Sequence, residues 1–340
     1  MTTFGVKALR QIQMNREDTQ GTATTDYTPW RGTGSLEDMI ETVFPEEDIG
    51  IFGGVDRSYI PKSGGQIVLE GVATYEQMPH IFDAAIYAAT ATTDASSAFI
   101  RTWTFPIVTS DAKVSTDLMT YSFKFGDNAE VEQAHFGFIP EFGMSGTAGE
   151  AVNVSATFQT RAVSTDSAGF ETVSIPAVEE MLFSKGKLYL DAYDGTIGST
   201  QVSNTLLSAD LKVTTGWMGV YAADGRVDFG FLKQTQPEVV LEVTFEHNDT
   251  AMAEKTYWRA GTTRLLQLLI EGTALTDAVG GTYAVKAFVV NLAGKWEKFS
   301  SLDEQDGNDI VTGTFRARYN SDSGRFAQFI VANETETMPG

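Results

Sequence analysis

The side chains of this sequence with the greatest capacity for catalysis or metal binding are its histidines and its acidic runs. The three histidines, His80, His135 and His247, follow no metal-ligand spacing, and the chain has no cysteine to complete a zinc site. We expect each of them to be an ordinary surface or partly buried residue. The run DEQDGND at residues 303–309 resembles a calcium loop but lacks the Glu that closes one, so a solvated hairpin tip is the better interpretation.

Motifs for phosphate binding and for nucleophilic catalysis are missing from the sequence. There is no Walker-type loop and no G-x-S-x-G elbow. The glycine-rich stretches at 143–149 and 280–281 lack the strand-loop-helix setting that holds a phosphate. The acidic stretches at 46–48 and 179–180 are ordinary in so acidic a chain. We therefore predict no catalytic residue, no cofactor, no metal site and no enzymatic activity.

The composition is that of a structured protein with a strong negative charge. The 340 residues carry a net charge of −21, 42% of them are hydrophobic, and 22 are phenylalanine. Nucleic-acid affinity comes mainly from Lys and Arg contacts with phosphate, so this charge argues against DNA or RNA binding, and it predicts repulsion from anionic membranes. Residues 1–14 lack a signal-peptide pattern, and the densest apolar stretch, 265–270, is too short to span a bilayer.

The sequence matches itself at two offsets. At an offset of 172, residues 53–70 fall on 225–242 without a gap, and Gly, Val-Asp and Val-Leu-Glu recur at matching positions. At an offset of 157, residues 137–161 fall on 294–318, with Arg161 on Arg318. The matched blocks keep their order and the period is about half the chain, so we predict two tandem copies of one module rather than a solenoid. The alternative is that two β-rich stretches share Val and Gly by composition.

Alternating apolar and polar residues predict a mostly β chain, with one wet and one buried face on each strand. The predicted strands include residues 11–14, 120–125, 187–190, 241–245 and 314–319, and the Asp-Gly pairs at 194, 224 and 306 predict turns between strands. Helical spacing instead predicts a helix over 75–90 and a second over 253–271, which Gly272 would end. Residues 35–43 fit either a short helix or a strand.

These patterns predict a fold class and a division of the chain. We expect a mainly β fold with a helix per repeat, arranged as two tandem β-sandwich or barrel domains produced by internal duplication. The first domain covers 1–163, a linker or strap 164–185, the second domain 186–333, and a flexible C-terminal tail 334–340. The offset falls from 172 to 157 along the chain, so the two copies are not fully equivalent.

Three segments resemble the major tail tube proteins of long-tailed, non-contractile bacteriophages, and the resemblance extends over nearly the whole chain. They are QIQMNREDTQGTA at 11–23, VFPEEDIGIFGGVDRSYIPKSGG at 43–65, and FSKGKLYLDAYDGTIGSTQVSNTLLSADLKVTTGW at 183–217. The resemblance rests on pattern and order rather than on a catalytic signature. It implies tail-tube-type domains, a fold that tube proteins of contractile tails and of type VI secretion share.

The resemblance also implies a role and partners. The chain would assemble with itself in the host bacterial cytoplasm into stacked rings of the virion tail, around a channel for DNA delivery. Its other partners would be the tape measure protein, the tail terminator, and distal tail or baseplate proteins. Family rings have six tube domains, so two domains per chain imply trimeric, pseudo-hexameric rings. We expect channel-facing carboxylates to let DNA slide without binding.

Contacts between stacked rings are expected on two matched loops, residues 45–65 and 222–237. Both loops mix apolar and charged residues, as protein interfaces do. The residues that we expect to carry the contact are Asp56, Arg57, Tyr59, Asp228, Phe231 and Lys233. The alternative is that Tyr59 and Phe231 are core residues.

Two other classes of function remain open at this point. One is a different ring protein of the same virion, such as a tail terminator or a baseplate hub. The other is a carbohydrate-binding β-sandwich adhesin, which exposed tryptophans on a flat face would favour. The five tryptophans do not cluster in the sequence. An enzyme of an unrecognised family is a more distant third.

Overall fold

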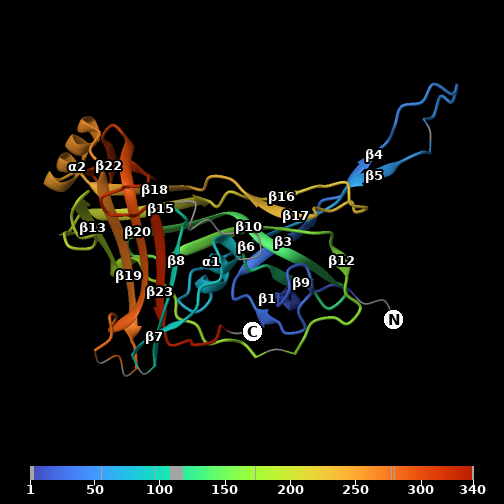
Figure 1. Ribbon diagram of the computed structural model, residues 1–340, viewed down its shortest axis with the longest axis horizontal. Helices are drawn as coiled ribbons and strands as arrows, with labels where there is room; N and C mark the ends of the chain where they lie inside the picture. The colour runs from blue at the N-terminus through green and yellow to red at the C-terminus, as the bar shows by residue number, and fades with distance from the viewer. Residues whose placement is uncertain are drawn as a thin grey trace.

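The computed structural model describes residues 4–54, 56–95, 97–107, 118–172, 174–276, 278 and 280–338. Within them the chain is mainly β, as predicted, and strands of both halves join one large antiparallel system. Two α-helices are present in these residues, α1 (Met78–Ala85) and α2 (Asp249–Ala260), one in each half (Figure 1).

Short strands make up most of the first half. They are β1 (Gln11–Arg16), β2 (Thr28–Pro29), β3 (Thr33–Asp38), β4 (Glu41–Val43), β5 (Tyr59–Lys62), β6 (Gly65–Val72), β7 (Thr92–Ala95), β8 (Ala98–Thr104), β9 (Tyr121–Gly126), β10 (Val131–Thr147), β11 (Asn153–Thr160) and β12 (Ser164–Thr165). A 3-10 turn, η1 (Lys7–Leu9), precedes β1.

The second half begins after a 3-10 turn, η4 (Phe183–Lys185). Its strands are β13 (Gly186–Ala192), β14 (Gln201–Val202), β15 (Leu206–Thr214), β16 (Trp217–Val220), β17 (Phe231–Gln234), β18 (Glu238–Glu246), β19 (Arg264–Ala274), β20 (Val285–Phe299), β21 (Asp303–Gln305), β22 (Asn308–Ala317) and β23 (Ala327–Asn333).

Strand pairing follows the same order in both halves. In the first half the order is β2-β1-β9-β10-β11-β6-β3. In the second half it is β14-β13-β19-β20-β22-β18-β15. A separate hairpin lies between the last two strands of each order along the chain, β4–β5 in the first half and β16–β17 in the second.

The two halves are joined by a seam between β10 and β15. Seven residue pairs form it, from Glu141 opposite Thr214 to Thr147 opposite Ser208. A second connection runs through β23, which pairs with β20 on one side and with β8 of the first half on the other. The sheet is therefore continuous from one half to the other.

Side chains along the seam separate into a buried face and a polar face. On β15, Ala209, Leu211 and Val213 are buried, and their neighbours Asp210, Lys212 and Thr214 are not. The same alternation runs along β11 and β18. Phe158 of β11 and Phe315 of β22 are completely buried on the core face.

The two helices occupy different environments. Every residue of α1 is buried, and its Phe82 ring contacts Phe142 of the first half and Phe288 and Phe329 of the second, with ring centroids 5.1–5.8 Å apart. One core cluster therefore draws on both halves. Helix α2 lies on the outside of the sheet, with only Ala251 and Glu254 buried (Figure 1).

The predicted helix over 253–271 is wrong in its second part. Asn248 caps α2 by accepting from the backbone N–H groups of Thr250 and Ala251, and Gly261 ends it in the left-handed region at φ 64°. The chain then forms strand β19, so Gly272 ends no helix. Leu265, Leu266 and Leu268 are all buried, and a strand covered on both faces shows no alternation from which to recognise it.

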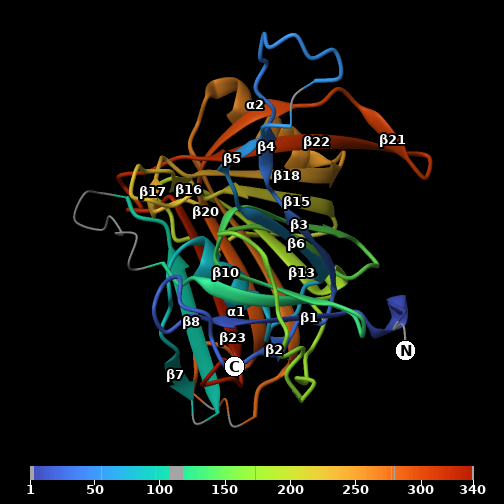
Figure 2. The same cartoon turned by 90° about the vertical axis from the view of Figure 1, so that its right-hand side faces the viewer.

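Other expectations have mixed outcomes. Of residues 35–43, which fitted either a helix or a strand, 35–38 lie in β3 and 41–43 in β4. The run 303–309 is an exposed β21–β22 hairpin, as predicted, with Asp306 and Gly307 at positive φ in its turn (Figure 2). His80, expected at the surface or partly buried, is in fact completely enclosed. In the predicted C-terminal tail, Arg101 donates hydrogen bonds to the carbonyls of Thr335 and Glu336.

Candidate assembly interface

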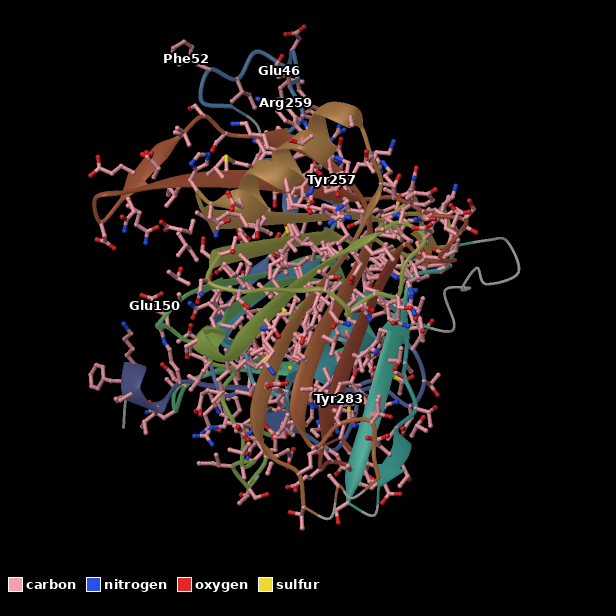
Figure 3. All side chains as sticks on the ribbon, turned by 90° about the vertical axis from the view of Figure 1, so that its left-hand side faces the viewer. Glu46, Phe52, Glu150, Tyr257, Arg259 and Tyr283 are labelled. Carbon is pink, nitrogen blue, oxygen red and sulfur yellow. The ribbon has the colours of Figure 1, made fainter. Side chains whose placement is uncertain are left out.

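The β4–β5 hairpin forms an arm that projects from the rest of the molecule (Figure 1). Its tip, residues 44–58, carries exposed apolar side chains, including Phe44, Ile49, Ile51 and Phe52. Figure 3 shows Glu46 and Phe52 at the far end of the arm. A fully exposed Phe52 gains nothing from folding in an isolated chain, so the arm has the character of a binding element.

The two loops expected to form the interface lie next to each other at the base of the arm. The backbone N–H of Ser63 donates to the carbonyl of Val227 over 3.0 Å, and the Tyr221 hydroxyl donates to the carbonyl of Ser63 over 3.4 Å. The Lys62 ammonium lies 4.6 Å from the centre of the Tyr221 ring. A groove runs between them, lined by residues that include Glu37, Met39, Ile40, Lys62, Met218 and Tyr221.

The structure places the six predicted interface residues on these two hairpins, as separate exposed or partly exposed groups. Asp56, Arg57 and Tyr59 are on the arm, where Arg57 forms an ion pair with Glu47. Asp228, Phe231 and Lys233 are on the β16–β17 hairpin, where Asp228 pairs with Arg226 over 2.9 Å. Tyr59 and Phe231 are 52% and 50% exposed, so neither is a core residue of the single chain.

The β16–β17 hairpin is held against the first half by Arg161. The Nε of Arg161 donates to the carbonyl of Phe229 over 3.0 Å, and its Nη2 donates to the carbonyl of Gly230 over 2.8 Å. The guanidinium also lies 4.2 Å from the centre of the Phe136 ring. Beneath it, a small buried cluster joins the two halves: Leu118, Phe136, Phe138, Trp217, Phe229 and Leu232.

A second candidate surface is the polar face of the continuous sheet. Residues directly opposite on neighbouring strands share a face, and one such row runs Glu70, Ser155, Gly143, Lys212, Val240. The adjacent row runs Asn153, Ser145, Asp210, Glu242, Thr314. The second row consists entirely of short hydroxyl and amide side chains and carboxylates, whereas the first is mixed, with Gly143, Lys212 and Val240 beside Glu70 and Ser155. A hollow in this face is lined by residues of β6, β10, β11 and β15.

Two cations of the polar face, Lys212 and Arg316, are paired with carboxylates. Lys212 lies 3.1 Å from Asp210, and Arg316 forms ion pairs with Glu297, at 2.8 Å, and with Glu238. The pairing raises the pKa values of Lys212 and Arg316, through hydrogen bonds to those carboxylates. Cations neutralised in this way offer a passing phosphate little free positive charge.

The buried polar groups form structural contacts. Trp103 Nε1 donates to Asp83 over 2.8 Å, and the Asp83 carboxylate also accepts from the backbone N–H of Ala89. Burial raises the pKa of Asp83 to about 6, and it lowers the pKa of the enclosed His80 to about 3. Across the described residues, His, Asp and Glu nowhere gather in a group of three or more that could hold a metal ion.

Tryptophan exposure bears on the adhesin alternative. Trp30, Trp103, Trp217 and Trp296 are buried, and Trp258 is packed against the core. No flat tryptophan platform of the kind that stacks on sugars is therefore present on the part of the surface that the structure describes.

Neither the family models nor the curated proteins that were compared match the chain. No helix among the described residues combines the length and the apolar character that crossing a bilayer requires.

Two features of the interface were not recognised from sequence. Arg161 was seen only as a repeated position, because its contact with Phe229 joins residues 68 apart. The row from Glu70 to Val240 depends on strand pairing that crosses between the halves. The sequence showed only the alternation along each strand. That pattern identifies the solvent-exposed face of one strand, but it does not show that the exposed faces of strands from both halves form one surface.

Proposed function

We propose that the chain is a structural virion protein that self-assembles into stacked rings, forming the tail tube of a long-tailed, non-contractile phage. Three chains make each ring, with six similar lobes around a channel through which DNA passes to the host. Its contacts would be with itself, with the tape measure protein, and with the terminator and distal proteins at the tube ends.

The observation that carries this proposal is the repeated strand order. Seven strands in each half pair in one order, each order is interrupted at the same place by a separate hairpin, and a helix follows β6 as it follows β18. The matched sequence offset of 172 places β5 on β17, both four residues long. An internal duplication accounts for all of these correspondences at once, and two like modules in one chain suit a ring with twice as many lobes as chains.

The polar face supports the assignment of a channel wall. It is continuous across the seam, so one chain contributes a wide curved segment of uniform character rather than two separate patches. Carboxylates such as Glu70 and Glu242 repel the phosphates of duplex DNA, and the paired Lys212 and Arg316 do not grip them. Between the charged residues, the exposed Ser145, Ser155 and Asn153 present short polar side chains that carry no positive charge to bind phosphate.

The arm supports stacking between rings. It extends beyond the sheet by the length of its tip, and its apolar residues lack a cover in the single chain. In a tube the tip would reach the next ring, where Phe52 and its neighbours would be buried. The Arg57–Glu47 ion pair braces the arm from within.

Electron cryomicroscopy of the purified, concentrated protein, sorted by end-on symmetry, tests the proposal. Threefold rings with six similar lobes are the expected result. Sixfold rings of whole chains would keep the tube role but leave one half outside the wall. A protein that stays monomeric at every concentration would contradict the proposal.

A virion ring protein of another kind is the nearest alternative, since the same sheet and arm could form a single ring at the end of a tail. Copy number separates the two: a tube needs many rings per particle, and a terminator or hub needs one or a few. Against a carbohydrate-binding adhesin stands the burial of Trp30, Trp103, Trp217 and Trp296.

A further inference from the structure

Corresponding edge strands of the two halves have different surroundings. Strand β15, last in the order of the second half, pairs with β18 on one side and with β10 on the other. Strand β3 stands last in the order of the first half and pairs with β6. On its other side the described residues supply no partner strand. An open strand edge presents unpaired N–H and C=O groups that readily accept another strand.

A matching open edge lies at the end of β20. This strand corresponds to β10, whose end is covered by β11 on one side and by β15 on the other. In β20, Lys298 and Phe299 pair with β22. On the opposite side, the indole N–H of Trp258 donates to the carbonyl of Glu297, and from Lys298 onward the described part of the chain provides no second strand.

We propose that β3 of one copy pairs antiparallel with the end of β20 in a neighbouring copy, repeating between chains the β10–β15 seam found within each chain. The occupant of both open edges is thus a second copy of this chain. The inference rests on the ring assembly proposed above, and it adds which strands close the ring and in which register.

The register follows from residues that share an opposite partner. Lys212 lies opposite Val240, and Ser35 lies opposite Val68, the matched valine of the first half, so Thr214 corresponds to Glu37. Glu141 lies opposite Thr157, and Lys298 lies opposite Thr314, so these two also correspond. The seam pair Glu141–Thr214 then becomes Lys298 opposite Glu37 between chains.

This register gives complementary pairs on both faces of the new seam. On the polar face the exposed Glu37 meets the exposed Lys298, and opposite charges directly across a strand pair stabilise it. On the buried face the next pair along is Leu36 with Phe299, both packed against the core. A shift by one residue would place each of these side chains on the wrong face.

The base of the arm supplies an independent argument. Trp217 and Leu232 of the β16–β17 hairpin are buried against the first half, whereas Ile40 and Ile60 at the corresponding positions of the arm are 50% and 46% exposed. A hollow beside the second half could receive them, and it is lined by Pro237, Arg318, Tyr319 and Phe326 together with Pro106 and Ile107 of the first half. Arg318 matches Arg161 in sequence, but its side chain is exposed. This is expected if the hairpin that Arg318 would hold comes from the neighbouring copy.

Cysteine cross-linking tests the register directly, because the chain has no cysteine of its own. The double variant Glu37→Cys/Lys298→Cys is oxidised at a concentration at which the unmodified protein assembles, and products are separated without reductant. We expect intermolecular disulfides that end at a covalent trimer. In the matched control, Glu37→Cys/Lys295→Cys, the partners lie about 10 Å out of register, which is too far for a disulfide.

Charge reversal gives a second measurement that needs no oxidation. Glu37→Lys and Lys298→Glu singly should each raise the concentration needed for assembly at least tenfold, and the two reversals together should restore it. Electron micrographs of the same samples test ring formation separately from the pairing of β3 with β20. Rings that form without cross-linking above the control overturn the strand pairing and leave the ring function standing, whereas the absence of both rings and cross-links overturns both.

Discussion

The Nε of Arg161 donates a hydrogen bond to the carbonyl of Phe229 over 3.0 Å, so a side chain at the end of a first-half strand holds a hairpin of the second half. Arg318, at the matching position of the second half, is exposed. One molecule therefore contains an arginine that holds a hairpin, Arg161, and an arginine at the matching position, Arg318, whose side chain is exposed.

Replacing Arg161 should loosen the hairpin in the isolated chain. Arg161→Leu removes two charge-assisted hydrogen bonds and a contact with the Phe136 ring, so we expect a loss of about 2 kcal/mol in the free energy of unfolding. Urea denaturation at low protein concentration measures it. Arg318→Leu is the control, which should change stability by less than about 0.5 kcal/mol. Equal effects of the two substitutions would show that the clamp contributes nothing.

Acidity should affect stability through Asp83. Burial raises the pKa of Asp83 to about 6 in the folded chain, so folding favours the protonated carboxyl. The folded state is therefore more stable at low pH, and this contribution to the free energy of unfolding is lost as the pH rises to about 6. Asp83→Asn imitates the protonated form. We expect the stability of this variant relative to the unmodified protein to improve by about 1 kcal/mol between pH 5.0 and pH 7.5. A pH-independent difference in urea denaturation would mean that Asp83 is ionised throughout.

The ion pair under α2 should be far more sensitive than those on the surface. Glu254 and Arg264 are buried and 2.6 Å apart, and Trp296 also donates to Glu254 over 2.7 Å. Glu254→Gln leaves a buried guanidinium without its counter-charge, which we expect to destabilise the fold by about 3 kcal/mol. Glu297→Gln, which removes an exposed partner of Arg316, should change it by less than about 1 kcal/mol. Thermal unfolding of both variants provides the comparison.

Shortening the arm should separate ring formation from stacking. Replacing residues 46–54 with a short Gly-Ser turn removes Phe52 but keeps Ile40 and Ile60 at the base. We expect rings of normal symmetry and at least tenfold fewer tubes per ring in negative-stain micrographs. Phe4→Ser, which removes an exposed aromatic outside the arm, should leave tube length unchanged. Normal tubes from the shortened arm would assign stacking to another surface.

Positive charge on the polar face should slow DNA passage. Ser145→Lys and Ser155→Lys together place positive charges opposite Asp210 and Glu70, which removes much of the repulsion that these carboxylates exert on phosphate. Tubes should assemble normally and genome delivery in an infection assay should fall at least tenfold, more so at low salt. Ser167→Lys, at an exposed position outside these rows, is the control. Unchanged delivery would argue that the face does not line the channel.

Local pattern was sufficient to predict the first strand of each half, β1 and β13, because apolar and polar residues alternate in their sequences. It failed at β19, where Leu265, Leu266 and Leu268 are buried on both faces and the alternation disappears. It also missed β8, since that strand is completed only by β23, more than 200 residues later. The candidate interface depends on the same non-local pairing: Tyr59 and Phe231 could be named from composition, but Arg161 and Glu37 could not.

The seam between β10 and β15 also bears on how fast a ring could form. Two modules tethered in one chain meet at a high effective concentration, so half of the contacts around a closed ring would form during folding, whatever the dilution. Only three contacts between separate molecules, rather than six, would then remain to be formed. A ring of fused pairs should therefore nucleate with a lower reaction order in protein than a ring of single modules.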